Sequence, residues 1–497
     1  MRVAVPALLG LLGVARLGCA LVLPAGRVVH RQMAETATES GGIDVPAAFA
    51  TTAVATASLQ QLQRSVAVWD VIMEDFEDDL ELDTEDDEAS REVKRRRVYV
   101  RKDYTKSGWW QELMELRETG ETDHTTREAR RFRNNFRVPY PFFVHLVGLV
   151  RDRDWFPTGE SDVTGRQAVP VELKVLACLQ ILSRGNVFAD IYHMSFISFQ
   201  TVASTFHRFC KYFAAELYDE YVYLPTGEDL RKVMEQYDRI GFPGAVGSTD
   251  VTHIYWGMCP YNQARIYTGK EGKPTVAFQV TVDHSGRVLA VTRGFTGATN
   301  DKTIIRYDKA VTRIRTDPVY TEQKYKLYAQ DGQQFEEKGC YLLVDNGYHK
   351  WRTLIPPSKC PIDRGDLIFS KRLESARKDV ECYFGILKGR FRINKLAIGF
   401  HKQEYIDNVF FTCCILHNML HSFDNRGDMS EEPNWAGSAG LHNAADRDPN
   451  TDYSSVGSMD GQHEAVEVET GFGALRSKLV TNFVYRREKK RDIVWLS

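Results

Sequence analysis

Between residues 171 and 213 the apolar positions follow a helical period. The pattern predicts a first helix, a turn at Gly185, a short helix over 189–192, a tight connection around Ser195 and a longer helix over 199–213. Three helices with a short turn before the last have the outline of a helix-turn-helix. A small helical bundle without a role in DNA binding is the alternative interpretation.

The last of these helices is predicted to expose short polar and basic side chains. Such groups suit contacts in a DNA groove, through hydrogen bonds to base edges and phosphates. The predicted contacts are Gln200, Ser204, Arg208 and Lys211, and His207 is expected to be exposed beside them.

From Gly241 the pattern changes to that of strands. The segment 245–256 reads as a strand around Asp250, 274–297 reads as a hairpin, and 338–349 contains a short apolar strand that ends on Asp345. Two helical stretches follow, over about 370–391 and 403–423. This order predicts an α/β class with helices covering a mixed sheet.

The helix predicted over 370–391 has an apolar stripe and a polar stripe beside it. The apolar stripe predicts packing on a core and contains Val380, Phe384, Leu387 and Phe391. The polar stripe contains Arg377, Glu381, Gly385, Lys388 and Arg392. A glycine inside a helix costs roughly 1 kcal/mol relative to alanine, so Gly385 favours close approach of another group near Glu381. A solvated polar face with a Glu–Lys pair is the alternative.

Charge is segregated along the 497 residues. The net charge of −3 is the sum of −10 over 1–90, +11 over 91–423, −9 over 424–470 and +5 over the remaining residues. A basic body between acidic segments is typical of nucleic-acid binders with solubilising tails, although many other proteins share it. The basic cluster KRRRVYVRK at 94–102 fits a nuclear localisation signal or a phosphate-binding arm.

These patterns divide the chain into four parts. We expect a disordered region over 1–103, a helical domain over 104–235, an α/β domain over 240–423, and an acidic disordered tail with a basic end over 424–497. Residues 1–26 resemble a secretory signal. However, a polar stretch begins at Met33, which favours the alternative that the start codon has been assigned too far upstream. No uninterrupted apolar run is long enough to cross a membrane. Nine cysteines without zinc spacing favour reduced thiols.

Three carboxylates stand out against this pattern. Asp250 follows a strand start, Asp345 ends a buried strand, and Glu381 lies on the helix expected to face them. A carboxylate near a core is costly unless it is paired. Magnesium prefers such hard oxygen ligands, and two ions about 4 Å apart are able to promote phosphodiester cleavage. Chance alone could supply this spacing.

Several linked motifs give the chain a more specific resemblance. In order, they are STDVTHIYW, YTGKEGKPTVAFQVTVDHSGRVLAVTRGFTGATNDKTI, YLLVDNGYHKWRTLIPPSK, FSKRLESARKDVECYFGILKGRF and CCILHNML. Over about 105–425 the sequence resembles Harbinger-type transposases, which use DDE catalysis, and it is especially similar to a plant and protist branch.

The resemblance implies a ribonuclease H-like catalytic domain after a DNA-binding segment over 171–213. It aligns Asp250, Asp345 and Glu381 with a metal-binding catalytic triad that would hold Mg²⁺ or Mn²⁺, as two ions. Asp301 matches a further acidic position and is treated as an accessory ligand. On this reading Gly385 gives clearance, and three basic residues meet phosphates: Lys388, Arg390 and Arg392.

The sequence departs from the family at two places. Val251 follows Asp250 where the family usually has glycine, and Asn300 precedes Asp301 where it commonly has histidine. Neither change removes a ligand, but both would weaken activity if the family residue is needed. Near the acids, His253 and His349 are expected to pack or contact phosphate rather than act as bases.

The expected function is metal-dependent cleavage at transposon ends followed by strand transfer. Its expected partners are DNA, in the form of terminal inverted repeats and target DNA, and a Myb-like helper protein. A homo-oligomer is a further possible partner, and no membrane is expected. The expected location is the nucleus. The alternative is a domesticated, non-catalytic DNA-binding protein built on the same fold. A secreted hydrolase rests only on residues 1–26, and no GxSxG motif supports it.

Overall fold

The computed structural model describes residues 102–118, 126–156, 167–424 and 465–489, which lie within one compact unit. The acidic block, nearly all of the basic cluster at 94–102 and the N-terminal signal-like stretch lie outside the described residues. The disorder predicted for 1–101 therefore stays a prediction.

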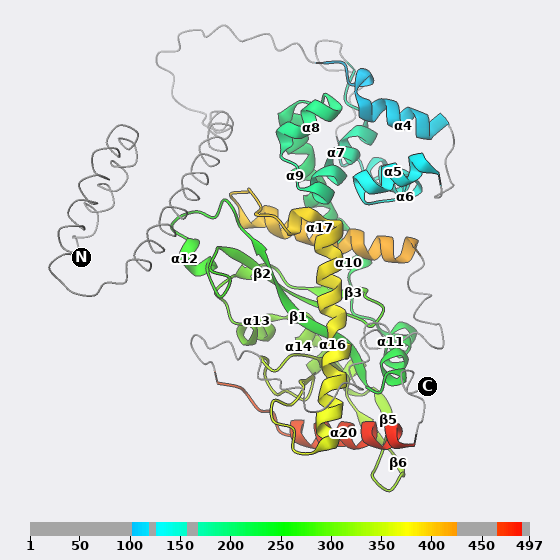
Figure 1. The fold of residues 1–497 in the computed structure, drawn as a ribbon, viewed down its shortest axis with the longest axis vertical. Coiled ribbons are helices and arrows are strands. Elements are labelled where there is room, and N and C mark those ends of the chain that lie inside the picture. Colours follow the sequence, from blue (N-terminus) through cyan, green and yellow to red (C-terminus); the bar gives the residue numbers. More distant parts are fainter. Residues whose placement is uncertain (1–101, 119–125, 157–166, 425–464, 490–497) are drawn as a thin grey trace, which may run out of the picture. The chain divides into compact units, whose positions relative to one another are not determined.

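A mixed sheet lies at the centre of the described chain (Figure 1). Its strand order is β3-β2-β1-β7-β8, and β4 pairs with β2. The strands are β1 (Ala245–Tyr255), β2 (Thr275–Val282), β3 (Val288–Val291), β4 (Phe295–Thr296), β7 (Tyr341–Leu343) and β8 (Leu354–Ile355). The pairs β1–β2 and β2–β3 are antiparallel, whereas β1–β7 and β7–β8 are parallel. The predicted mixed α/β class, consistent with a ribonuclease H-like domain, is confirmed.

Helices flank this sheet. They are α11 (Gly227–Arg239), α13 (Asp301–Tyr307), α14 (Lys309–Thr316), α15 (Pro318–Thr321), α16 (Arg364–Arg390) and α17 (Gln403–Phe423), with η2 (Arg392–Asn394) between the last two. The long α16 crosses the sheet (Figure 1) and packs against β1. Its predicted apolar stripe is confirmed, since Val380, Leu387 and Phe391 are fully buried.

Shorter helices precede the sheet. They are η1 (Tyr104–Lys106), α4 (Gly108–Glu118), α5 (Arg127–Phe136), α6 (Tyr140–Asp152), α7 (Val171–Arg184), α8 (Phe188–Ser195), α9 (Phe199–Glu216) and α10 (Tyr218–Tyr221). The predicted order of helices over 171–213 is confirmed. Gly185 ends α7 with φ 70°, and a Cβ there would lie 2.5 Å from a Leu396 methyl group, so both backbone and packing require glycine.

The helical part does not form a domain with its own core. Helix α9 packs on α17, and one hydrophobic cluster runs from Leu113 in α4 to Leu420 in α17. The Thr412 hydroxyl of α17 donates a hydrogen bond to the Cys210 carbonyl of α9 at 3.2 Å. The boundary expected between 235 and 240 lies within a second hydrophobic cluster, which contains Met234 on one side and Ala245 on the other.

The tail predicted over 424–497 needs a correction. Residues 465–489 are ordered in the structure, and α20 (Phe472–Glu488) packs on α16 and on a small hairpin of β5 (Lys324–Tyr328) and β6 (Gln334–Lys338). Acidic composition hid an apolar helical stripe, in which Phe472, Leu475, Leu479 and Phe483 are buried.

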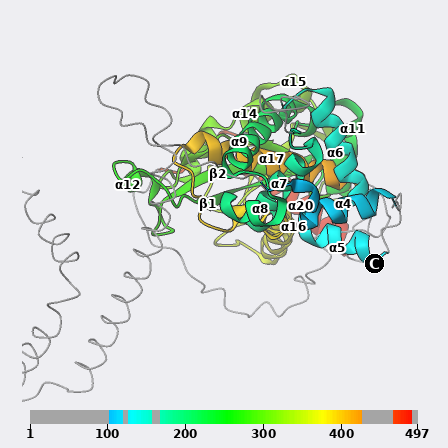
Figure 2. The same ribbon diagram turned by 90° about the horizontal axis from the view of Figure 1, so that it is seen from above.

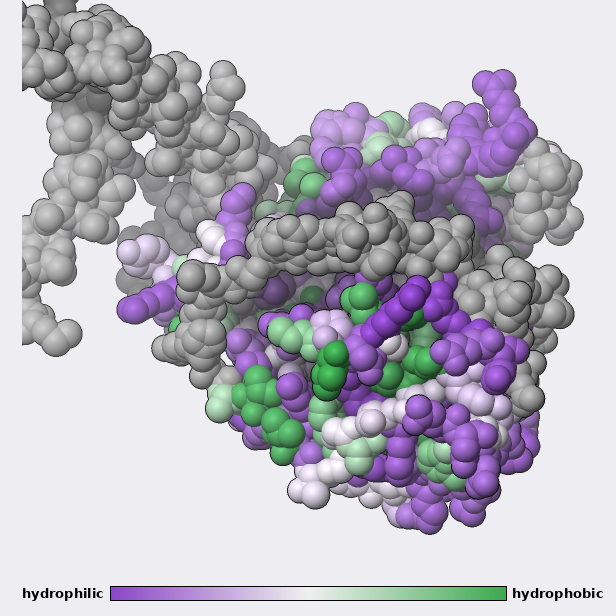
Figure 3. Space-filling model, turned by 60° about the horizontal axis from the view of Figure 1, so that its bottom comes forward, coloured by the Kyte–Doolittle hydropathy of each residue, from purple (hydrophilic) through white to green (hydrophobic). Residues whose placement is uncertain are grey.

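Seen with the lower end of Figure 1 forward, the described surface is mainly hydrophilic, and its hydrophobic side chains form separate patches (Figure 3). Among the described residues, no helix has the length and apolar character that a membrane crossing requires. All eight described cysteines are free, and five of them are buried.

Candidate active site

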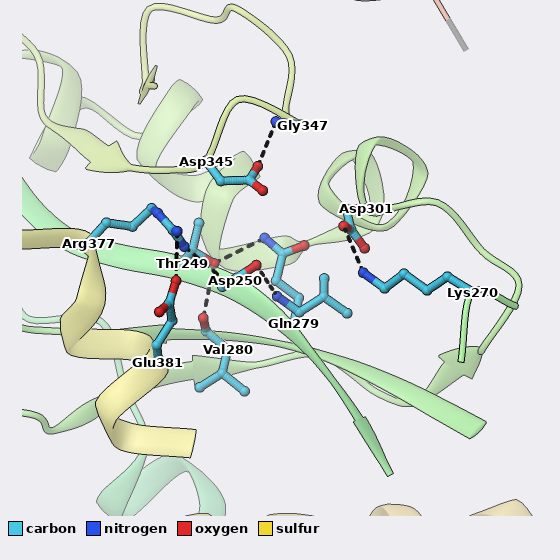
Figure 4. Close-up of polar contacts among 11 residues, drawn as sticks. Thr249, Asp250, Lys270, Gln279, Val280, Asp301, Asp345, Gly347, Arg377 and Glu381 are labelled. Atoms are coloured by element: carbon cyan, nitrogen blue, oxygen red, sulfur yellow. Dashed lines mark hydrogen bonds and ion pairs between the residues drawn. The ribbon is translucent and has the colours of Figure 1, made fainter. Parts of the chain in front are cut away.

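Two aspartates lie on neighbouring parallel strands. Asp250 lies in the middle of β1, and Asp345 follows the end of β7 by two residues. The parallel pairing of β1 with β7 brings the loop after β7 to the part of β1 that carries Asp250 (Figure 4). The structure thus brings together two of the residues predicted from the sequence.

The Asp250 carboxylate is largely buried, with 21% of its side chain exposed. One oxygen accepts a hydrogen bond from the Val251 backbone N–H at 2.8 Å, and the other lies 3.2 Å from an Arg377 nitrogen. Burial raises the pKa of Asp250 to about 6; Arg377 opposes this rise, and the nearby Asp345 adds to it. The surroundings therefore disfavour the ionised form of Asp250.

The Asp345 side chain is held by its own loop. Its Oδ1 accepts a hydrogen bond from the Gly347 N–H at 2.7 Å. A Cβ at Gly347 would lie 2.9 Å from that same oxygen, so a larger residue there would displace the Asp345 carboxylate. The loop therefore fixes the direction in which Asp345 leaves the sheet.

Asp301 is the third acid of this group. It is the first residue of α13, and the Asn300 side chain caps that helix by accepting from the Lys302 N–H at 2.9 Å. Burial raises the pKa of Asp301; Lys270, 4.0 Å away, lowers it, and Asp345 raises it. Of the two departures from the family, Asn300 uses its side chain to cap α13, whereas Val251 donates only its backbone N–H, as a glycine would.

Buried Tyr348 lies among these three acids. Burial raises the pKa of its hydroxyl strongly, and the charges of Asp250, Asp301 and Asp345 raise it further. That hydroxyl has no hydrogen-bond partner among the described residues. The charges of all three aspartates therefore act on this one hydroxyl. We refer to Asp250, Asp301 and Asp345 as the aspartate cluster.

Glu381 reaches this cluster through an arginine. Its side chain is 44% exposed and lies 2.7 Å from the second terminal nitrogen of Arg377, one helical turn earlier on α16. Arg377 therefore bridges Glu381 and Asp250 (Figure 4). The sequence placed Arg377 on the same polar stripe but did not indicate this bridge; its spacing of four residues from Glu381 was the available signal.

The aspartate cluster offers only hard oxygen ligands, which suit Mg²⁺ or Mn²⁺ in kind. Within the described ranges, however, no three His, Cys, Asp or Glu side chains are grouped closely enough to enclose a metal ion. Magnesium usually takes one or two carboxylates and completes its shell with water and phosphate. Asp250 and Asp345 fit that requirement, with Tyr348 as an unpartnered polar group beside them.

The two nearby histidines are structural. The His253 ring contacts the Thr275 hydroxyl at 2.9 Å, and burial lowers its pKa to about 4. His349 is fully buried; its Nδ1 accepts from the Glu467 N–H, so its Nε2 donates to the Lys302 carbonyl at 3.2 Å. The sequence preference for packing over general-base catalysis agrees with these positions.

The residues predicted to bind DNA lie in two groups. On α9 four of them are exposed, namely Gln200, Ser204, Arg208 and Lys211. His207 is not exposed as expected: its ring stacks with Tyr405 at 4.2 Å, and burial lowers its pKa to about 4.

The basic residues in and after α16 differ in their exposure to solvent. Arg392 is exposed and Arg390 is half-buried. Lys388 is partly buried and donates to the His253 carbonyl at 3.1 Å, so its position is fixed from within the fold. A Cβ at Gly385 would meet no atom within 4 Å, so the fold itself does not require this glycine.

Comparison with known proteins agrees with this architecture. Residues 219–429, which span the sheet and the aspartate cluster, match the plant transposon protein family. The chain is 22% identical over 324 residues to the protein ALP1-like of Arabidopsis thaliana, covering 64% of this chain and 76% of that protein. No solved structure gave a significant match. The region that carries the candidate site is therefore similar to plant transposon proteins, in line with the resemblance to Harbinger-type transposases.

Proposed function

We propose that this transposase-family protein is a metal-dependent DNA nuclease that cuts at transposon ends and joins the freed end to target DNA. The observation that supports it most is the aspartate cluster, in which the charge of Asp345 raises the pKa of both Asp250 and Asp301. A fold that served only for packing would gain by replacing such charges. Such a group of negative charges favours a cationic ligand.

The roles of the residues follow from their positions. Asp250 and Asp345 would bind the metal directly. Asp301 and Glu381 would lie at the edge of the metal site as accessory acids. When bound, the metal would supply positive charge to a phosphate oxygen and lower the pKa of a water molecule. The chain itself orients Asp345 through Gly347 and balances Asp250 through Arg377, which keeps the acids in place before DNA arrives.

Three further proposals complete this picture. The exposed α9 residues and Arg392 would contact DNA outside the site, by groove and phosphate contacts respectively. The basic cluster at 94–102 would direct the protein to the nucleus. A Myb-like helper would assist end recognition, in line with the family resemblance.

The test is cleavage of a labelled terminal-repeat duplex in Mg²⁺ by the full chain and by Asp345→Asn. The variant should lose at least about 100-fold in cleavage rate while retaining its DNA affinity, because a lost ligand disables the chemistry alone. Glu336→Gln, at an exposed ion pair on β6, is the matched control and should cleave normally. Equal cleavage by Asp345→Asn and wild type would remove Asp345 from the catalytic role.

A domesticated, non-catalytic DNA-binding protein is the second candidate. The Arg377 bridge favours it, because an arginine already neutralises Asp250 and Glu381 without a metal. Titration with Mn²⁺ separates the two functions. Stoichiometric binding that Asp345→Asn abolishes supports the nuclease, and the lack of any binding supports the domesticated protein.

A further inference from the structure

The connection between β1 and β2, residues 257–274, carries an unusual exposed surface. We call it the β1–β2 excursion; it contains the short helix α12 (Ala264–Tyr267), which lies at the outer edge of the described chain in both ribbon views (Figures 1 and 2). Tyr261 is 89% exposed and Ile266 is 54% exposed. Both rank among the most exposed large apolar side chains that the structure describes.

The same excursion also carries cationic side chains. Arg265, Lys270 and Lys273 are all exposed, and Glu271 is the one acid in the same stretch. A stretch that exposes both apolar and cationic side chains is complementary to a polyanion that also presents flat apolar faces. Nucleic acid with unpaired bases has both properties.

The β1–β2 excursion is fixed firmly to the body of the fold. The Gly257 N–H donates to the Ile398 carbonyl at 2.8 Å, and the Tyr267 hydroxyl donates to Gln403 at 2.5 Å. At its far end, a Cβ on Gly269 would collide with the Gly297 carbonyl, so two glycines allow the backbones to touch. Its exposed side chains therefore project from a rigid base.

This fixed position places the β1–β2 excursion beside the aspartate cluster. Lys270 lies 4.0 Å from Asp301, and the Lys270 side chain is still 65% exposed. The Lys270 ammonium thus lies between an acid of the cluster and the solvent. A phosphate bound by Lys270 would lie next to the proposed site of cleavage.

We propose that the β1–β2 excursion binds a DNA end with unpaired bases, and this proposal rests on the proposed nuclease function. Arg265, Lys270 and Lys273 hold backbone phosphates, while the Tyr261 ring stacks on an unpaired base and Ile266 packs beside it. Stacking requires a base whose face is not covered by a neighbouring base. In a paired duplex such bases occur only at the ends. The excursion therefore selects frayed or opened DNA over intact duplex.

The test uses fluorescence anisotropy of the full chain in EDTA, so that no cleavage occurs. One probe is a short paired duplex, and the other is the same duplex with a fork of unpaired thymines. Tyr261→Ala should weaken binding of the fork about 5- to 20-fold, as expected for the loss of one aromatic stack, and leave duplex binding nearly unchanged. Lys273→Ala should weaken both probes and reduce the salt dependence by about one ion.

Matched controls lie elsewhere on the surface. Tyr223→Ala removes an exposed tyrosine and Lys326→Ala an exposed lysine of β5, and neither should change binding of either probe. Equal binding of the fork by Tyr261→Ala and wild type would overturn the proposal, as would an equal loss on both probes or no binding of either probe by wild type.

The same variants separate this proposal from the nuclease proposal. If Tyr261→Ala loses fork binding but wild type shows no Mg²⁺-dependent cleavage, the DNA contact stands and the nuclease function fails. If cleavage depends on Asp345 but Tyr261→Ala binds the fork normally, the nuclease function stands and the β1–β2 excursion has no part in DNA binding.

Discussion

The Arg377 guanidinium lies 3.2 Å from the Asp250 carboxylate, although the two residues are 127 positions apart in the chain. Both side chains are mostly buried, at 15% and 21% exposure, so solvent screens their attraction less than it screens a surface pair. Arg377 also holds Glu381, which makes it the main positive charge next to the aspartate cluster in the protein without metal.

Arg377→Ala should therefore destabilise the metal-free protein. We expect a loss of about 1–3 kcal/mol in the free energy of unfolding, because Asp250 would keep its buried charge without a partner. Urea denaturation in EDTA measures it, and Arg377→Ala should cost much less in the Asp250→Asn background than in the wild type. Arg313→Ala, at an exposed pair with Asp317, should cost under about 0.5 kcal/mol. Additive effects of Arg377→Ala and Asp250→Asn would contradict the coupling.

Asp250→Asn should stabilise the metal-free protein, and the effect should depend on pH. The folded pKa of about 6 lies above the ordinary value of 3.8, so ionised Asp250 costs the folded state free energy. That cost is absent below about pH 4, grows between about 4 and 6, and is complete above 6. We therefore expect a gain of about 1–3 kcal/mol at pH 7.5 and none at pH 3.5.

Thermal unfolding of wild type and Asp250→Asn across this pH range, in EDTA, measures the difference. Asp317→Asn is the control, because its carboxyl pKa is lowered by the Val319 N–H and Arg313, so its substitution should destabilise the protein at neutral pH. A melting temperature for Asp250→Asn below that of wild type at pH 7.5 would show that Asp250 is stabilised by its surroundings instead.

The sequence predicted the parts of this molecule that depend on local periodicity. The apolar stripe of α16, the helices around Gly185 and the strand that leads to Asp345 each follow from spacings within about one element. Parallel pairing of β1 with β7 then brings Asp250 and Asp345 together, as expected for carboxylates on neighbouring strands.

What the sequence did not indicate depends on contacts between distant segments. The Arg377–Asp250 pair and the Lys270–Asp301 pair join residues with no shared pattern. Helix α20 was missed because the acidic composition around it outweighed four apolar positions, Phe472, Leu475, Leu479 and Phe483. His207 was placed on the exposed side of α9, because the sequence alone does not show that Tyr405 packs there.

Phe483→Ala should show that α20 belongs to the core. Phe483 is fully buried; its ring stacks on Phe242 at 6.0 Å and meets Phe369 edge-on at 5.7 Å, so its loss leaves a cavity beside α16. We expect a loss of about 3–5 kcal/mol in the free energy of unfolding, as is typical of a large buried aromatic residue. Urea denaturation measures it, with exposed Ser477→Ala on the same helix as the control. A change under about 1 kcal/mol for Phe483→Ala would mean that α20 is dispensable.

Glu467 should affect metal binding from outside the aspartate cluster. One of its oxygens lies 2.7 Å from Arg306 on α13, the helix that Asp301 begins, and the other accepts from the Trp351 indole N–H at 2.9 Å in the segment after Asp345. The backbone on either side of Val468 also pairs with Lys350. Glu467 thus connects the two segments that carry Asp301 and Asp345.

Glu467→Ala should therefore weaken Mn²⁺ binding by about 10-fold, as is typical when a group that orients metal ligands is removed. Its side chain is 50% exposed, so the free energy of unfolding should fall by under about 1 kcal/mol. Titration with Mn²⁺ followed by electron paramagnetic resonance measures the affinity, and urea denaturation measures the stability. Glu322→Ala removes an exposed ion pair with Lys338 and should change neither quantity appreciably. Unchanged Mn²⁺ affinity in Glu467→Ala would show that the two acid-bearing segments hold their positions without this C-terminal contact.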